Sequence, residues 1–216
     1  MVFPWFAYGG LAAASLGIDL QQISECHRLM EASLRRELTD FEQRINRQAE
    51  GMTDSQKQEF YEFHADSHWE FSEAFPAIFR SSLFVSTYAL LEARLDDLCH
   101  DMQRKNKCEL VLSDIHGKGI RRAQTYLKKV ARVPFPDEKW GAVMLLSRVR
   151  NVLVHADGWL KEDETGHSVK AFAEANPKLI GINATRKIVL QEDFVPHALS
   201  AVRGFFEALY STLHRS

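Results

Sequence analysis

Cysteine is scarce in this sequence, and its pattern excludes two classes of protein. Three cysteines occur among 216 residues, at Cys26, Cys99 and Cys108. None is paired at the short spacing that structural zinc sites use, and an odd number cannot form a complete set of disulfides. We therefore expect reduced thiols, as in a cytoplasmic protein.

Positive charge is missing from the N-terminal region. Residues 1–18 carry no charged side chain, and the first Lys or Arg is Arg28. A secretory signal begins with such a residue, and Pro4, Gly9 and Gly10 interrupt any membrane-spanning helix. Residues 1–18 are therefore predicted to form an apolar arm that packs on the fold or on a partner subunit, without membrane association.

The chain also lacks a large excess of either charge, internal repeats and low-complexity tracts. A net charge of −2 gives no overall attraction to nucleic acid, so any such attraction must come from a local patch. Apolar residues make up 45% of the chain and charged residues 26%, as in ordinary soluble globular proteins. A chain of this length can bury a sizeable core, so we expect a single domain over residues 1–216.

Apolar residues recur at helical spacing through most of the chain. Two short apolar runs, at residues 179–182 and 187–190, predict a β-hairpin within a peripheral insertion over residues 159–192. The sequence therefore predicts an all-α, up-and-down helical bundle with a small appended hairpin near residues 179–190. Gly51 should end the first helix, and Pro76 should break or kink the chain between the second and third. The expected helices cover residues 19–48, 54–75, 77–106, 120–133, 140–156 and 194–214.

The helix over residues 140–156 is strongly apolar but carries Arg150, Asn151 and His155 near its end. A buried cation is costly unless it is paired or faces water or an anion. Arg150 and His155 lie about 140° apart around an ideal helix, so their side chains do not point in one direction. A long arginine reach, a loosened last turn, or a second copy of the helix across a two-fold axis could bring them together.

The segment Arg150-Asn-Val-Leu-Val-His155 resembles the Arg-polar-x-x-x-His signature of the HEPN superfamily of small all-helical domains. Residues 82–99 are also similar to a core helix found early in these domains, so the resemblance covers roughly residues 77–160. It implies a metal-independent ribonuclease that needs no cofactor, with Arg150, His155 and Asn151 as catalytic groups. It also implies a homodimer whose two subunits line one cleft, a role in toxin–antitoxin or phage-defence systems, and an antitoxin or regulatory protein as a further partner.

One residue departs from the pattern of the HEPN toxins that are paired with nucleotidyltransferase antitoxins. Those toxins have a tyrosine two places after the histidine, whereas Asp157 stands there in this chain. Control by modification at that tyrosine is therefore not expected.

The residue types at this motif suit RNA cleavage. RNA carries its own nucleophile in the 2′-hydroxyl, so an enzyme needs a base, an acid and a cation for the developing phosphorane charge. Histidine can serve as base or acid near neutral pH. Arginine stays protonated and offers a planar fork that matches phosphate oxygens.

Other interpretations of the same residues stay open. Arg150 could pair with a buried carboxylate such as Glu92, and His155 could donate to a carbonyl near the helix end. The chain would then be a non-catalytic HEPN-like module that binds RNA, a nucleotide or a protein. A further alternative is a structural bundle in which the aromatic segment 54–75 mediates assembly.

Charge is distributed unevenly between two segments. Residues 118–133 contain six cations and no acid, whereas residues 53–75 contain six acids and one lysine. The basic segment is predicted either to guide RNA or to be an ordinary solvated helix face. Its glycines do not have the spacing of a phosphate-binding Walker loop. The candidate RNA-binding residues are Lys118, Arg121, Arg122, Lys128 and Lys129.

His64 and His68 are four residues apart, a spacing that can hold a metal from one helical face. A metal site would need further ligands from elsewhere, and no glutamate follows His64 as zinc proteases require. We interpret these residues as part of a solvated acidic face and expect no metal site.

Overall fold

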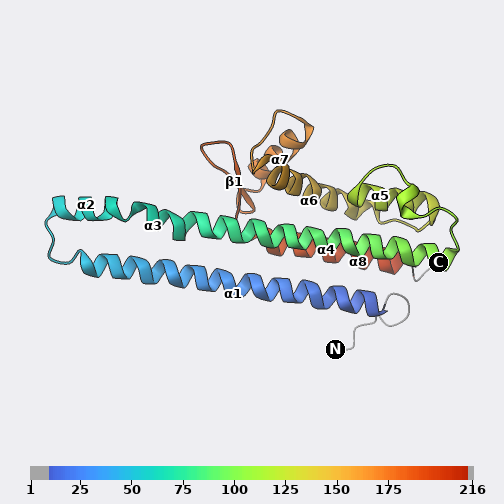
Figure 1. Cartoon of the computed structure of the whole chain (residues 1–216), viewed down its shortest axis with the longest axis horizontal. Coiled ribbons are helices and arrows are strands. Elements are labelled where there is room, and N and C mark those ends of the chain that lie inside the picture. Colours follow the sequence, from blue (N-terminus) through green and yellow to red (C-terminus); the bar gives the residue numbers. More distant parts are fainter. Residues whose placement is uncertain (1–9, 214–216) are drawn as a thin grey trace.

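Two long helical stretches run side by side along the molecule (Figure 1). The structure is a computed structural model and describes residues 10–213. The first stretch is α1 (Gly10–Gln48), whose 39 residues extend about 58 Å. It begins before residue 19, so residues 10–18 of the predicted apolar arm form its first turns, and Leu16 is buried in the core. Residues 1–9 of that arm lie outside the described residues.

A tight turn connects α1 to α2 (Asp54–Phe63). Gly51 adopts a φ of +82°, which L side chains rarely tolerate, and this ends α1 as predicted. The Thr53 hydroxyl then accepts from the Gln56 amide at 3.4 Å, and the Gln56 side chain accepts from the Thr53 amide at 2.9 Å. This reciprocal capping box fixes the start of α2.

The second long stretch passes through α3 (Ala65–Trp69), the π-helical turn η1 (Glu70–Ala74) and α4 (Phe75–Asn106). Of the two outcomes predicted for Pro76, a break or a kink, the break is wrong, because one helix continues from Ala65 to Asn106. The Phe75 amide donates to the Glu70 carbonyl, five residues earlier. This wider turn makes room for a proline ring that has no amide hydrogen to donate.

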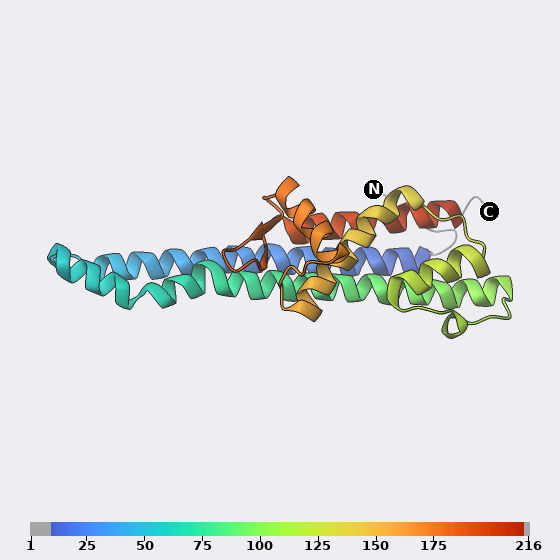
Figure 2. The same ribbon diagram turned by 90° about the horizontal axis from the view of Figure 1, so that it is seen from above.

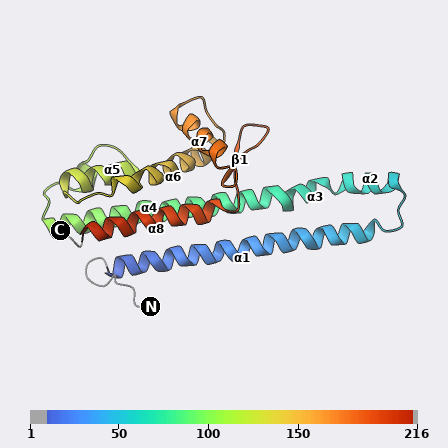
Figure 3. The same cartoon turned by 180° about the vertical axis from the view of Figure 1, so that it is seen from behind.

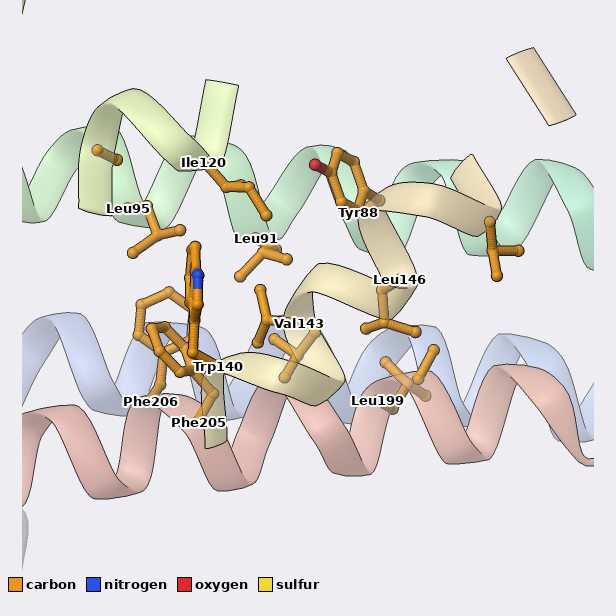
Figure 4. Close-up of a cluster of buried hydrophobic side chains, with 14 of the residues drawn as sticks. Tyr88, Leu91, Leu95, Ile120, Trp140, Val143, Leu146, Leu199, Phe205 and Phe206 are labelled. Carbon is orange, nitrogen blue, oxygen red and sulfur yellow. The ribbon is translucent and has the colours of Figure 1, made fainter. Parts of the chain in front are cut away.

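The core lies where α4 meets α6 (Asp137–Ala156) and α8 (Phe194–Leu213). Leu91 and Leu95 of α4 project toward Val143 of α6, with Phe205 and Phe206 of α8 beside them (Figure 4). The predicted helix over residues 120–133 is α5 (Gly119–Thr125) continuing as a second π-helical turn, η3 (Tyr126–Val130), and also packs on α4. A short 3-10 turn, η2 (Leu112–Asp114), precedes it. The prediction of an all-α bundle is confirmed.

The predicted hairpin is also confirmed. Strand β1 (Ile180–Ile182) pairs antiparallel with β2 (Ile188–Leu190), and Ile180 faces Leu190 in the register. Helix α7 (Glu164–Ala175) precedes it, capped by the Asp163 side chain, which accepts from the Gly166 amide at 2.7 Å. The hairpin and α7 rise from one side of the bundle (Figures 1 and 2). Val169, Ile180 and Leu190 are nevertheless fully buried, so this insertion contributes to the core and is not merely peripheral.

The helix from Ala65 to Asn106 is long and apolar enough to cross a membrane by length and composition alone. Core helices of soluble proteins pass the same test. Its apolar residues Phe84, Leu91 and Leu95 are fully buried against the other helices of the bundle. Of the apolar stretch that meets this test, 28% is buried in the described part of the chain. The three cysteines are free thiols.

A buried ion pair joins α1, α4 and the hairpin. The Arg80 guanidinium donates to both carboxylate oxygens of Glu31, at 2.7 and 2.9 Å, and its third contact is with the Leu190 carbonyl at 3.4 Å. The Glu31 side chain is 3% exposed and that of Arg80 is 15% exposed. Because both charges are desolvated, each depends on the other for compensation.

We expect Arg80→Met to destabilise the fold by about 3 kcal/mol, because it leaves the Glu31 carboxylate buried with only the imidazole of His27, 3.6 Å away, beside it. The double variant Arg80→Met, Glu31→Leu should recover most of this loss, since it removes both charges. Urea denaturation measures both effects. A single variant as stable as the wild type would show that Glu31 finds another partner or becomes hydrated.

Candidate functional site

Arg150, Asn151 and His155 come together near the C-terminal end of α6. The Arg150 Nη1 group lies 3.0 Å from Nε2 of His155 and donates to Oδ1 of Asn151 at 3.2 Å. The 140° offset between Arg150 and His155 is therefore bridged by the length of the arginine side chain, one of the three arrangements considered from the sequence. A second copy of the helix is not needed for this contact.

The contact places a ring nitrogen of His155 directly beside a permanent cation. A guanidinium has only donors, so Nε2 of His155 is the acceptor when this contact is a hydrogen bond. A ring nitrogen with a free lone pair is the group that can act as a base.

The aromatic ring of Tyr88 in α4 lies against the guanidinium of Arg150. The guanidinium carbon lies 5.6 Å from the centre of the Tyr88 ring, and the tyrosine hydroxyl donates to Ser147 of α6 at 3.0 Å. Tyr88 is buried at the edge of the core (Figure 4). Burial raises the pKa of its hydroxyl, while the hydrogen bond to Ser147 acts in the opposite direction. The tyrosine thus remains neutral and offers an aromatic face to the cation.

Glu92, one turn further along α4, is the carboxylate considered as an alternative partner for Arg150. Among the described residues Arg150 forms no ion pair, and its guanidinium bonds to His155 and Asn151. Burial raises the pKa of the Glu92 carboxyl, the charge of Arg150 opposes this, and Asp96 adds to it. A Cβ atom at Gly119 would lie 2.6 Å from Oε1 of Glu92, so this carboxylate lies against the start of α5.

The Arg150 cluster is open to solvent. Asn151 and His155 are exposed, and Arg150 is partly buried. Arg150 is therefore anchored on the core, while the imidazole of His155 lies in an exposed part of the helix. A large ligand can reach this surface without entering the bundle.

Two neighbours of the motif were not identified from the sequence. Trp159 is 45% exposed just after α6, and Nζ of Lys187 lies 5.3 Å from its ring centre. Lys187 also pairs with Asp157 at 2.5 Å. The tryptophan directly after Asp157-Gly158 was a visible signal, but the position of Lys187 depends on the bridge that pairs it with Trp159.

The basic face is smaller than the sequence indicates. Arg122 is partly buried, its Nε atom has no hydrogen-bond partner among the described residues, and its charge acts on the buried thiol of Cys99. Lys128 is paired with Asp137 at 2.8 Å. Of the five candidate residues, Lys118, Arg121 and Lys129 remain as exposed cations without an ion pair in the described part of the chain. We call these three residues the basic face.

The two histidines of the second helix do not act together. Nε2 of His68 lies 3.1 Å from Oε1 of Glu42 in α1, whereas His64 packs edge-on against Phe60, with ring centres 4.6 Å apart. Within residues 10–213, no group of three or more His, Cys, Asp or Glu side chains is arranged to hold a metal ion.

A cavity of about 720 Å³ lies at the C-terminal end of α4, between the first turns of α1 and the last turn of α8. Its lining includes Arg94, His100 and Tyr210, and it contains none of the predicted site residues. The Arg150 cluster is thus a surface site separate from this cavity.

Comparison with known proteins gave no relatives: no family model matches the sequence, and neither curated proteins nor solved structures contain a match. The fold and the site define a helical bundle with an arginine–histidine pair at the exposed end of a core helix. The resemblance to HEPN domains rests on that motif and on the helices that carry it.

We expect Glu92→Gln to stabilise the protein at neutral pH. The carboxyl pKa is raised in the folded state, so ionised Glu92 disfavours folding above that pKa, and the penalty disappears below the unfolded value of about 4.3. Glutamine carries no charge and avoids the penalty. Melting temperatures measured from pH 3 to 8 should show a gain that grows with pH, and a gain independent of pH would contradict this assignment.

Proposed function

We propose that this protein is a metal-independent endoribonuclease that uses Arg150, His155 and Asn151. The observation that carries the proposal is the 3.0 Å contact between the Arg150 guanidinium and His155 Nε2 at an exposed helix end. It pairs a permanent cation with a histidine nitrogen that can act as a base, and RNA cleavage by its own 2′-hydroxyl requires both groups.

The reaction would begin when a phosphate of the RNA binds the Arg150 guanidinium. This cation leaves Nε2 of His155 as it turns to the phosphate, because a charged oxygen is the stronger acceptor. His155 then takes the proton of the 2′-hydroxyl, the 2′-oxygen bonds to phosphorus, and the bond to the 5′-oxygen breaks. The leaving oxygen takes a proton from water, and the products carry a 2′,3′-cyclic phosphate and a 5′-hydroxyl.

Other groups would position Arg150 and the RNA. Tyr88 holds the guanidinium from the core side, and Asn151 accepts one of its hydrogen bonds. The exposed ring of Trp159 offers a stacking surface for an unpaired base, with Lys187 beside it. The basic face would hold phosphates further along the strand.

The biological setting is proposed from the HEPN resemblance. It comprises a homodimer that acts on RNA in a toxin–antitoxin or phage-defence system, controlled by an antitoxin or another regulatory protein. The cytoplasmic location is proposed from the cysteine pattern.

The central prediction concerns the pair itself. His155→Ala should lower the cleavage rate by roughly 10²- to 10⁴-fold, the contribution of a general base. Arg150→Lys should also lose most activity, because lysine keeps the charge but not the bidentate fork. Gel assays on RNA in the presence of EDTA, with mapping of the product ends, measure the rate and identify the cyclic phosphate.

His100→Ala is the matched control, since His100 is exposed on α4 and lies at the cavity away from this cluster. Circular dichroism and melting curves show whether each variant is folded. The mechanism is wrong if folded His155→Ala cleaves as fast as wild type, if EDTA abolishes activity, or if DNA is cut equally well. Retained RNA binding without any cleavage by the wild type would instead favour the non-catalytic binding module.

A separate prediction tests the basic face. The variant Arg121→Glu, Lys129→Glu should weaken RNA binding and reduce the salt slope of the affinity by about 0.7 for each lost phosphate contact on a single strand. Fluorescence anisotropy at several salt concentrations measures the slope. Arg28→Glu, Arg104→Glu is the control, because both of these cations are exposed elsewhere. Equal slopes for the wild type and the Arg121, Lys129 variant would make α5 an ordinary solvated helix.

A further inference from the structure

The cavity at the C-terminal end of α4 lies where α1 no longer covers the bundle. Helix α1 begins short of the last turns of α4, and α8 lies beside those turns (Figures 1 and 3). Only the first turns of α1 reach the cavity, where Ala12 is part of its lining. The volume of about 720 Å³ is in the range of small-molecule binding sites. The cavity is therefore large enough to hold a ligand.

The base of the cavity is apolar. Leu98 and Met102 of α4 are each 6% exposed, and Tyr210 of α8 is 4% exposed. Leu98 and Met102 lie four residues apart, so they are neighbours on one face of α4. Leu213 at the end of α8 adds a partly buried apolar side chain. These residues offer an apolar surface with one aromatic ring to a molecule in the cavity.

The mouth of the cavity is polar and open to solvent. Four exposed side chains of α4 belong to the lining here: Asp97, His100, Asp101 and Arg104. A ligand can therefore enter from solvent past these side chains and reach the apolar base.

Two polar groups of the lining lack hydrogen-bond partners among the described residues. The Nε atom of Arg94 is buried and has no acceptor. The Tyr210 hydroxyl forms no hydrogen bond with another described residue, although its side chain is buried. Burial raises the pKa of Tyr210 to about 12, so the hydroxyl keeps its proton at neutral pH and can donate it. The charge of Arg94 acts on this hydroxyl, so the two donors lie at the same part of the cavity.

The carboxylates of the lining, in contrast, each have a cation beside them. Nη1 of Arg94 lies 3.7 Å from Asp97, and Arg104 donates to Asp101 at 2.6 Å. What the cavity lacks is therefore an acceptor for Arg94 Nε and for the Tyr210 hydroxyl. A buried donor without an acceptor is costly, and a charged oxygen forms the stronger hydrogen bond with it.

We propose that this cavity binds a small organic anion, with an apolar or aromatic body and one negatively charged oxygen group. The charged group accepts from Arg94 Nε and from the Tyr210 hydroxyl, and the body packs on Leu98 and Met102. The body supplies affinity by burial, whereas the two donors give a preference for the anion over an uncharged molecule of the same shape. This site does not depend on RNA cleavage, because the cavity contains no residue of the Arg150 cluster.

Two fluorescent probes test this chemistry. Anilinonaphthalene sulfonate and phenylnaphthylamine have the same ring systems, but only the first carries a negative charge. The wild type should bind one molecule of either probe per chain, and it should bind the sulfonate more tightly. Fluorescence titration measures both affinities, and calorimetry measures the number of sites.

Two variants remove one donor each. Tyr210→Phe loses only the hydroxyl and should weaken sulfonate binding by roughly tenfold or more, as expected for a lost hydrogen bond to a charged group. It should leave the affinity for phenylnaphthylamine unchanged. Arg94→Lys keeps a cation beside Asp97 but removes Nε, and it should have the same selective effect.

Further variants separate this site from general effects. Leu213→Trp fills part of the cavity and should weaken both probes. Tyr61→Phe is the matched control and should change neither affinity, because the Tyr61 hydroxyl donates to Asn46 at the opposite end of the molecule (Figure 1). Circular dichroism and melting curves show that each variant is folded, since loosened proteins also bind the sulfonate probe.

The proposal is overturned if the wild type binds neither probe saturably or binds both with equal affinity. It is also overturned if the folded Tyr210→Phe and Arg94→Lys variants bind the sulfonate as tightly as the wild type. Binding that requires deletion of residues 2–9 would likewise overturn it, because the chain itself would then be the occupant.

Discussion

Helix α4 packs against α1, α5, α6 and α8 along one face of its C-terminal half, and this packing decides where polar groups can lie on that face. Phe84, Leu91 and Leu95 are fully buried and leave no room for an unpaired charge. The polar and charged side chains of α4 that contact other helices therefore lie at the margins of the core. Arg80 is held by Glu31, whereas Tyr88 and Glu92 border the surface where α5 and α6 cross α4.

The same packing restricts the position of the Arg150 side chain in the arginine–histidine pair. The Tyr88 ring and its hydrogen bond to Ser147 fix the surface on which the Arg150 guanidinium rests. Only the guanidinium at the end of that side chain can exchange its contact with His155 for a contact with a ligand. Preorganisation of this kind is what a cation needs to stabilise charge during a reaction, because little reorganisation remains to be done.

Much of the fold could be predicted from the sequence, because helical periodicity and turn residues act locally. The end of α1 at Gly51 and the hairpin near residues 179–190 both follow from neighbouring residues. The continuous helix through Pro76 could not be predicted, since the cost of a proline depends on whether the preceding turn can widen. The burial of Val169 and of the hairpin likewise depends on tertiary packing that no local pattern contains.

The candidate site could also be predicted only in part, because local sequence identifies its residues and tertiary packing positions them. Arg150, Asn151 and His155 were recognisable by residue type and spacing, but the direction of the arginine depends on Tyr88 from another helix. Arg122 and Lys128 counted as free cations in the sequence, yet one is partly buried near Cys99 and the other pairs with Asp137. Charge in a sequence is thus an upper bound on charge available at a surface.

The π-helical turn at Glu70–Ala74 has a consequence for how this architecture can vary. Such a turn accommodates one residue more than an α-helical turn, and each residue of an α-helix rotates the chain by about 100°. Everything before η1 is therefore out of angular phase with α4, so Trp69 does not continue the core stripe of that helix. Loss of a single residue here would leave every helix intact but turn α2 and α3, and Trp69 with them, to a different side of the molecule.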